Sequence, residues 1–262
     1  MRHLLPALLA ASVLSVSVAP AAPAPTLPPP KKLDRVPDPP PELAKELYQL
    51  DGAYRHGGDD KFAELEKRAD ELAKRFPEKD DQARIWAEVA HVAAQSGIDR
   101  HADRVRQYAG KCLAVSRDPL QRGRMYSYLA SAVDLKGTAF PGGRREAAVI
   151  LLRGYAEMLA QELPEQAPEL PGVERFDIDG DPVAEAQARA RQAAQRVARQ
   201  EAEFTHDLIT RRDTLVMQLR DLYKPEPNYH GRNPEGPDEL RALAKRKLTG
   251  EQVKVLMEKV TK

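Results

Sequence analysis

The chain has 262 residues, of which 42% are hydrophobic and 31% are charged. A chain of this length can remove about 70–75% of its unfolded surface from water, which is enough for a stable core. Lysine and arginine number 41 against 40 aspartates and glutamates, so the overall charge argues against binding to nucleic acid or to an anionic membrane surface.

The first 21 residues have the order of a secretory signal peptide. Arginine and histidine precede an apolar run over residues 4–19, and residues 19–21 read Ala-Pro-Ala, an A-x-A cleavage pattern. An uncleaved membrane anchor is the alternative, but about 16 apolar residues are short for a bilayer span of about 20. We therefore expect an exported protein, periplasmic or secreted, whose mature chain begins near Ala22.

Residues 22–41 are rich in proline and poor in apolar side chains. Such a composition predicts an extended tether between the cleavage site and the folded part of the chain. The folded part then begins with residues 42–163, where apolar residues recur at helical spacing. No run shows strict alternation of apolar and polar residues, so we expect no strand.

Two helices open this region. The first has apolar residues at intervals of four, three and four: Leu43, Leu47, Leu50 and Tyr54. The second follows a pair of glycines and has three apolar residues on one face: Phe62, Leu65 and Leu72. Each pattern predicts a helix that packs one side against a core.

One spacing recurs three times within residues 42–163. A large residue, an aliphatic residue, a small residue and a turn glycine stand at offsets 0, 3, 4 and 11, counted from Leu47, Trp86 and Tyr126. A small residue lets two crossing helices approach, and glycine accepts the left-handed conformation that ends a helix. The spacing therefore predicts that Trp86, the only tryptophan, is buried between two helices and does not mark a binding site.

This pattern resembles the tetratricopeptide repeat, whose first helix carries W-x-x-L-G-x-x-Y. The matching residues are Trp86, Val89, Ala90 and Gly97 in one copy and Tyr126, Leu129, Ala130 and Gly137 in the next. The sequence departs from the family in its period of 39–40 residues and in Asp51, which replaces the small residue of the first copy. The resemblance covers residues 42–163 and implies helix pairs that bind a protein or peptide.

After residue 163 the repeat pattern stops. Residues 164–182 form a connection rich in proline and acidic residues, and residues 183–223 predict one long helix with an apolar face in its second half. Two short helices close the chain, the last with a capping box formed by Thr249 and Gln252. The expected fold is all-α: a short tetratricopeptide-like array of α-hairpins, then residues 183–262 as a long helix and a small helical tail.

The resemblance also implies which residues line a groove, because the first helices of such arrays form it. Two positions before the large residue, all three copies are basic: Lys45, Arg84 and Arg124. A row of cations suits an acidic peptide or a terminal carboxylate. The neighbouring groove positions are Tyr48, His56, His91, Gln95, Ser127 and Ser131. The alternative is that the three cations are ordinary exposed residues of a chain rich in them.

Other motifs favour structural roles. The glycine-rich residues 137–148 lack the lysine and serine or threonine of a phosphate-binding loop, and the acidic residues 177–182 lack the spacing of a calcium loop. The six histidines do not fall into a paired metal-binding pattern. Cys112, the only cysteine, lies among apolar neighbours and is expected in the core. We therefore expect no catalytic residue, metal or cofactor.

The function expected from these patterns is a non-enzymatic scaffold or adaptor that binds a protein or peptide partner. Two alternatives stay open. One is an envelope enzyme, or its accessory subunit, with a site of unfamiliar geometry. The other is a small-ligand site between the repeat array and the long helix, which a closed apolar pocket at that place would favour.

The signal peptide yields the first testable prediction. N-terminal sequencing of the natural protein should find a mature chain that begins near Ala22, because the charged start, the apolar run and the cleavage pattern occur in the required order. A product that retains Met1 and stays inside the cytoplasm would show that residues 1–21 are not a signal peptide.

Overall fold

The computed structural model places six stretches of the chain: residues 36–54, 59–137, 143–161, 163–172, 182–223 and 236–261. The expected signal peptide and most of the expected tether lie outside these described residues. The same holds for His56, for residues 138–142 of the glycine-rich segment and for the acidic residues 177–181.

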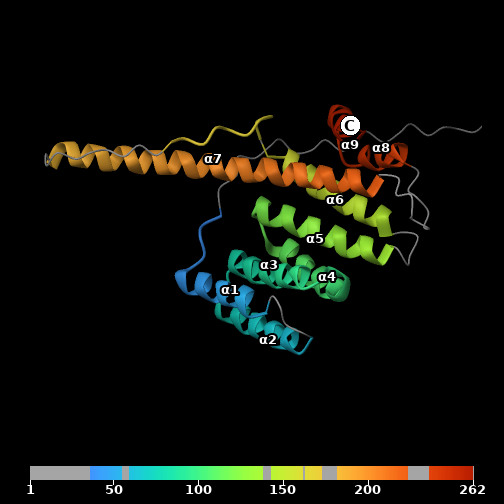
Figure 1. Cartoon of the computed structure of the whole chain (residues 1–262), viewed down its shortest axis with the longest axis horizontal. Helices are drawn as coiled ribbons and strands as arrows, with labels where there is room; N and C mark the ends of the chain where they lie inside the picture. Colours follow the sequence, from blue (N-terminus) through green and yellow to red (C-terminus); the bar gives the residue numbers. More distant parts are fainter. Residues whose placement is uncertain are drawn as a thin grey trace, which may run out of the picture.

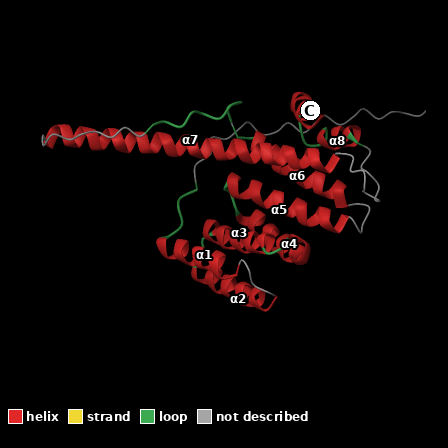
Figure 2. Cartoon of the chain, viewed as in Figure 1, coloured by secondary structure: helices red, strands yellow, loops and turns green. Residues whose placement is uncertain are grey.

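The described residues form nine helices, which Figure 1 labels in chain order. Their bounds are α1 Pro41–Tyr54, α2 Asp59–Arg75, α3 Lys79–Gln95, α4 Ile98–Val115, α5 Pro119–Gly137, α6 Gly143–Leu159, α7 Pro182–Tyr223, α8 Pro237–Ala244 and α9 Gly250–Thr261. Every regular element in these stretches is a helix (Figure 2). The prediction of an all-α fold with a long helix and a helical tail is confirmed.

The helices stack from α1 and α2 at one end to α7, α8 and α9 at the other (Figure 1). Consecutive helices pack in pairs, α3 against α4 and α5 against α6, and α7 lies across both α5 and α6. Among the described residues, no helix combines the length and the apolar character that crossing a membrane requires.

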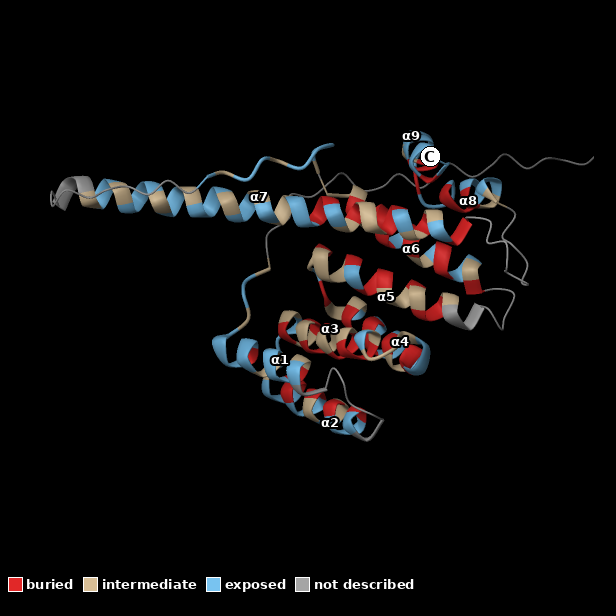
Figure 3. Ribbon diagram, in the orientation of Figure 1, coloured by how far each residue is buried: buried red, intermediate tan, exposed pale blue. Residues whose placement is uncertain are grey.

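Helix α7 has 42 residues, about 63 Å at 1.5 Å per residue, and only part of it packs on the other helices. Its first half extends past the body of the protein and is mostly exposed (Figure 3). From Leu208 onward one face is buried against α5 and α6: Leu208, Leu215, Leu219 and Leu222. The expected apolar face in the second half of this helix is therefore confirmed.

Helix α5 separates two hydrophobic cores. Met125 and Ala132 belong to the core that α5 shares with α1–α4, whereas Tyr126, Ala130 and Val133 belong to the core that it shares with α6–α9. A helix buried on two sides needs apolar residues around much of its circumference. The two cores therefore meet along α5, and its position determines how the two halves of the protein fit together.

Trp86 lies between α3 and α4, as its spacing predicted. Its ring centroid is 5.9 Å from that of Tyr108, and the Lys111 ammonium lies 4.5 Å from the Trp86 centroid. The ring is only half-buried, however, because a lysine of α4 lies over it where a fully buried ring would meet another apolar side chain. The expectation that Trp86 lies at a helix seam holds, whereas the expectation that it is buried there holds only in part, because its ring is partly exposed.

Two helix ends that the sequence predicts from local signals are present in the described residues. Gly97, between α3 and α4, has φ +118°, a conformation that side chains other than glycine rarely adopt. At α9 the Thr249 N–H donates to Gln252 Oε1 at 3.0 Å, and the Gln252 N–H donates to Thr249 Oγ1 at 3.3 Å. These two reciprocal bonds are the predicted capping box.

Glycine is also required where α5 and α6 cross. A Cβ atom at Gly154 of α6 would lie 2.9 Å from the Cβ of Tyr126 on α5. A contact that short forces neighbouring groups to move. By contrast, a Cβ atom added at Gly110 on α4 would meet no other group within 4 Å, so the two glycines form a matched pair for mutation.

Gly154→Ala should lower the free energy of unfolding by about 1–3 kcal/mol, the usual range for overpacking a core. Gly110→Ala should raise it by roughly 0.5–1 kcal/mol, because alanine is the better residue inside a helix. Urea melts of both variants measure the difference. A Gly154→Ala protein as stable as the Gly110→Ala protein would contradict the close crossing of α5 and α6.

Candidate functional site

Side chains from three helices meet on one face of the protein. His91 Nδ1 of α3 lies 2.6 Å from the Tyr128 hydroxyl of α5, and the two rings stack with centroids 5.9 Å apart. Gln95 interacts with the same hydroxyl, and Arg124 and Arg211 lie near it. We call these five residues the α3–α5–α7 surface.

Helical spacing explains why these side chains converge. His91 and Gln95 are four residues apart on α3, and Arg124 and Tyr128 are four residues apart on α5, so each pair shares one face of its helix. Arg211 comes from the packed half of α7. Since α5 contacts both α3 and α7, side chains of all three helices come together around Tyr128.

The two arginines of this surface have no ion pair among the described residues. Burial lowers the pKa of the Arg211 guanidinium, and the positive charge of Arg124 lowers it further. Asp207, one turn earlier on α7, partly offsets both effects. The Nε atom of Arg211 is buried and has no hydrogen-bond partner in the described structure. Within the described part of the chain, the two cations therefore lie near each other with no carboxylate in ion-pair contact with either of them.

Arg84, which the sequence placed in the same row of cations, is already neutralised. Its Nη1 lies 3.0 Å from Asp81 Oδ1, and its Nη2 donates a hydrogen bond to the carbonyl of Pro37. Pro37 belongs to residues 36–40, an extended segment that we call the strap. The strap runs from the start of α1 toward α7 (Figure 1).

A cleft of about 320 Å³ lies between the strap and helices α3, α5 and α7. Asp118 lines it and accepts a hydrogen bond from the Leu120 N–H at 3.0 Å, as the residue that caps α5. Burial raises the pKa of Asp118, while its backbone bonds and the charges of Arg84 and Arg124 oppose that rise. Asp118 thus links the cleft to the α3–α5–α7 surface.

The predicted groove residues fall into five groups. His91, Gln95 and Arg124 lie on the α3–α5–α7 surface, and Arg84 binds the strap. Lys45 and Tyr48 are exposed on α1; among the contacts of the described residues, none joins them to the surface. His56 lies outside the described residues. The remaining two, Ser127 and Ser131, face α7.

The two serines contact one side chain of α7. Ser127 Oγ donates to Gln218 Oε1 at 2.7 Å, and Gln218 Nε2 donates to Ser131 Oγ at 3.4 Å. These serines therefore help to dock α7 onto α5. Sequence reasoning missed Tyr128 and Arg211, although the four-residue spacing from Arg124 to Tyr128 was available as a signal.

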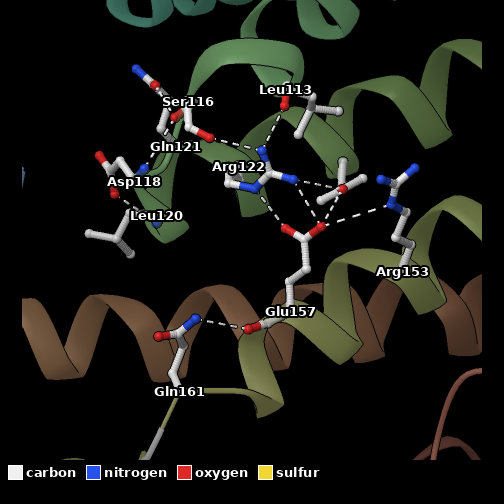
Figure 4. A network of polar contacts seen from close by, with 10 residues as sticks. Leu113, Ser116, Asp118, Leu120, Gln121, Arg122, Arg153, Glu157 and Gln161 are labelled. Carbon is white, nitrogen blue, oxygen red and sulfur yellow. Dashed lines mark hydrogen bonds and ion pairs between the residues drawn. The ribbon is translucent and has the colours of Figure 1, made fainter. Parts of the chain in front are cut away.

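A second group of charged residues surrounds Arg122 and connects α4, α5 and α6 (Figure 4). Arg122 Nε and Nη2 lie 2.7 and 2.9 Å from the two carboxylate oxygens of Glu157. Its Nη1 donates to the carbonyls of Leu113 and Ser116, at 2.6 and 2.9 Å. The Tyr126 hydroxyl donates to Glu157 at 2.6 Å. These groups satisfy one another, so the cluster ties helices together, although Arg122 and Glu157 also line a cleft of about 300 Å³.

Comparison of the chain with models of protein families, with curated proteins and with solved structures gives no match. The resemblance to the tetratricopeptide repeat therefore stays a prediction. Within the described part of the chain, no group of three histidine, cysteine, aspartate or glutamate side chains could hold a metal ion. The geometry of the α3–α5–α7 surface and the strap is thus the basis for any functional proposal.

Two arginines, Arg122 and Arg153, contact the carboxylate of Glu157, and they should contribute unequally to stability. Arg122→Met should lower the free energy of unfolding by about 3 kcal/mol, because it leaves Glu157 without its main partner. Arg153 is 66% exposed and lies 3.9 Å from Glu157, so Arg153→Met should cost less than about 1 kcal/mol. Equal losses in urea melts would contradict the central role of Arg122.

Glu157 also predicts a dependence of stability on pH. Burial raises its pKa, but the hydrogen bonds and charge of Arg122, together with Tyr126, outweigh this effect, so the pKa in the folded state lies below its usual value. The stabilisation is therefore present above the unfolded-state pKa of about 4.3 and is lost as the pH falls below it. In thermal melts, Glu157→Gln should flatten the loss of stability between about pH 5 and pH 3. The same loss of stability at low pH in Glu157→Gln and in the unsubstituted protein would contradict a contribution from Glu157.

Proposed function

We propose that this chain is an exported, non-enzymatic scaffold that binds a protein or peptide partner on the α3–α5–α7 surface. The observation that carries the proposal is the strap. Beside this surface the protein already holds an extended stretch of polypeptide, and Arg84 binds it through the carbonyl of Pro37.

The strap indicates what kind of ligand this region accommodates. It reads Val-Pro-Asp-Pro-Pro and has no helical structure in the described chain. Prolines restrict an extended chain before it binds, so less conformational entropy is lost on binding. The cleft of about 320 Å³ between the strap and α7 leaves room for part of a second extended segment, and it adjoins the arginines of the surface.

Two features support a binding role over catalysis. Burial raises the pKa of the Cys112 thiol to about 12, which keeps it protonated and weakly nucleophilic at neutral pH. Glu157, a half-buried carboxylate of lowered pKa, is bound by Arg122 and Tyr126. Both groups therefore serve the packing of helices in this proposal.

The small-ligand alternative has weaker support. The strap cleft also lies between the array and α7, and its volume of about 320 Å³ is within the range of roughly 300–1,000 Å³ that is usual for small-molecule sites, but carboxylates line it, among them Asp118, Glu203 and Asp207. The cleft between α5, α6 and α7 has a volume of about 180 Å³, below that range. Its lining includes Asp134, Arg144 and Asp221, whereas the alternative called for a closed apolar pocket. Export, the remaining part of the proposal, rests on the pattern of residues 1–21.

Site-specific photo-crosslinking tests the proposed surface. Gln95 of α3 lies on it, and Gln107 of α4 is an equally exposed glutamine elsewhere. A photoreactive phenylalanine analogue should replace each glutamine in turn in the full chain, which is then irradiated in an envelope extract of its own cells. We expect a discrete crosslinked protein from position 95 and none from position 107. The same products from both positions, or none from position 95, would contradict the proposal.

A further inference from the structure

We infer that Arg124 and Arg211 together bind a carboxylate group of the partner, supplied either by an acidic side chain or by the end of a polypeptide. This inference rests on the proposed function, because it names the chemistry that the α3–α5–α7 surface selects. It differs from the row of cations suggested by the sequence, since it replaces Lys45 and Arg84 with an arginine of α7.

The first support is the contrast with other arginines that are partly or largely buried. Several of them have a carboxylate of this chain within ion-pair distance: Arg84, Arg104, Arg122, Arg144 and Arg212. Arg211 and Arg220 are half-buried and have no such ion pair among the described residues. Arg211 differs from Arg220 because a second cation, the exposed Arg124, acts on it, and Arg124 likewise has no ion pair in the described chain. A desolvated cation is unfavourable unless it is paired, so an anion is the ligand that would compensate Arg211, with the exposed Arg124 beside it.

The second support is that the fold holds Arg211 in position. The Arg211 side chain crosses α5 at Gly123, where an added Cβ atom would lie 2.6 Å from Arg211 Cγ. Any other residue at position 123 would displace this arginine. Gly123 directly precedes Arg124 in the chain, so the glycine that admits one guanidinium group is next to the residue that provides the other.

The charges around the pair favour a carboxylate over a phosphate group. Asp207 acts on Arg211, and Glu88 and Arg124 both act on the neighbouring Tyr128. Asp118 also acts on Arg124. The two cations thus share their surroundings with three carboxylates, so a bound dianion would leave more negative charge uncompensated than a bound monoanion. Guanidinium groups bind carboxylates and phosphates alike through two parallel N–H donors, so the choice of a carboxylate rests on the surrounding charges.

Four probes can test this chemistry by NMR, with the Nε–Hε resonances of Arg124 and Arg211 in the full chain as the readout. The first is an acetylated and amidated Gly-Pro-Glu-Gly peptide, and the second is an acetylated Gly-Pro-Gly peptide with a free terminal carboxylate. The amidated Gly-Pro-Gln-Gly peptide is the neutral control, and inorganic phosphate tests a dianion. We expect saturable shifts with the first or the second probe, and at least tenfold weaker binding of the neutral peptide and of phosphate.

Three variants locate the binding. Arg124→Gln and Arg211→Gln should each weaken binding of the carboxylate peptide at least tenfold. Gly123→Ala should weaken it as well, because it displaces Arg211. Arg191→Gln, which removes an exposed charge from the same helix α7, should leave binding unchanged. The inference is overturned if phosphate binds more tightly than both carboxylate peptides, if neither carboxylate peptide binds, or if Arg191→Gln weakens binding as much as Arg124→Gln. Since Arg124 is exposed, its variant keeps the test valid even if the other two fail to fold.

The same variants separate this inference from the proposed function. If the crosslink at position 95 forms but is undiminished in the Arg124→Gln and Arg211→Gln proteins, the surface binds a partner and the carboxylate site is wrong. If no crosslink forms at position 95 in the protein with both arginines intact, the proposed function itself is wrong.

Discussion

The guanidinium group of Arg122 is the contact on which the arrangement of the helices depends. It makes hydrogen bonds to the last carbonyls of α4, to the Tyr126 hydroxyl and to both oxygens of Glu157 on α6. An arginine has five N–H donors, and these contacts use all of them. Because α5 separates the two hydrophobic cores, the same group also fixes how the two halves of the protein meet. A partly buried ion pair of this kind holds helices in register only when all its members are satisfied.

Two residues further along α5, Arg124 has the opposite situation. It faces away from the Glu157 cluster and lies beside a second cation, Arg211, with no ion pair to a carboxylate of the described chain. Helix α5 is thus held in place by Arg122 and presents Arg124 to a potential ligand. The packing around Arg122 supplies the rigidity that a preorganised binding site requires.

Much of the fold could be predicted from the sequence because its signals are local. Apolar spacing located the helices, and the Thr249–Gln252 capping box needed only three residues of separation. The candidate site needed more, since Arg211 approaches Arg124 only after α7 has folded back onto α5, and the Ser127–Gln218 bond joins residues 91 positions apart. The half-exposed ring of Trp86 was missed for the same reason, because Lys111 reaches it from a different helix. From its composition, the strap is predicted only to be a tether. The sequence carries no signal that Arg84 binds this segment, because the bond is made to a backbone carbonyl.

The measurement that bears most directly on the unpaired cations is a double-mutant cycle in the free protein. The free energy of unfolding would be compared for the unsubstituted protein, for Arg124→Met and Arg211→Met, and for the double variant. The cycle compares the change in the free energy of unfolding that Arg124→Met causes in two backgrounds, with Arg211 present and with Arg211 replaced. If the two guanidinium groups repel each other, this change should be more stabilising with Arg211 present, by a few tenths of a kcal/mol to about 1 kcal/mol. An Arg124→Met change that is less favourable in the presence of Arg211 would show that the two side chains support each other in the free protein, and would contradict a site held open for an anion.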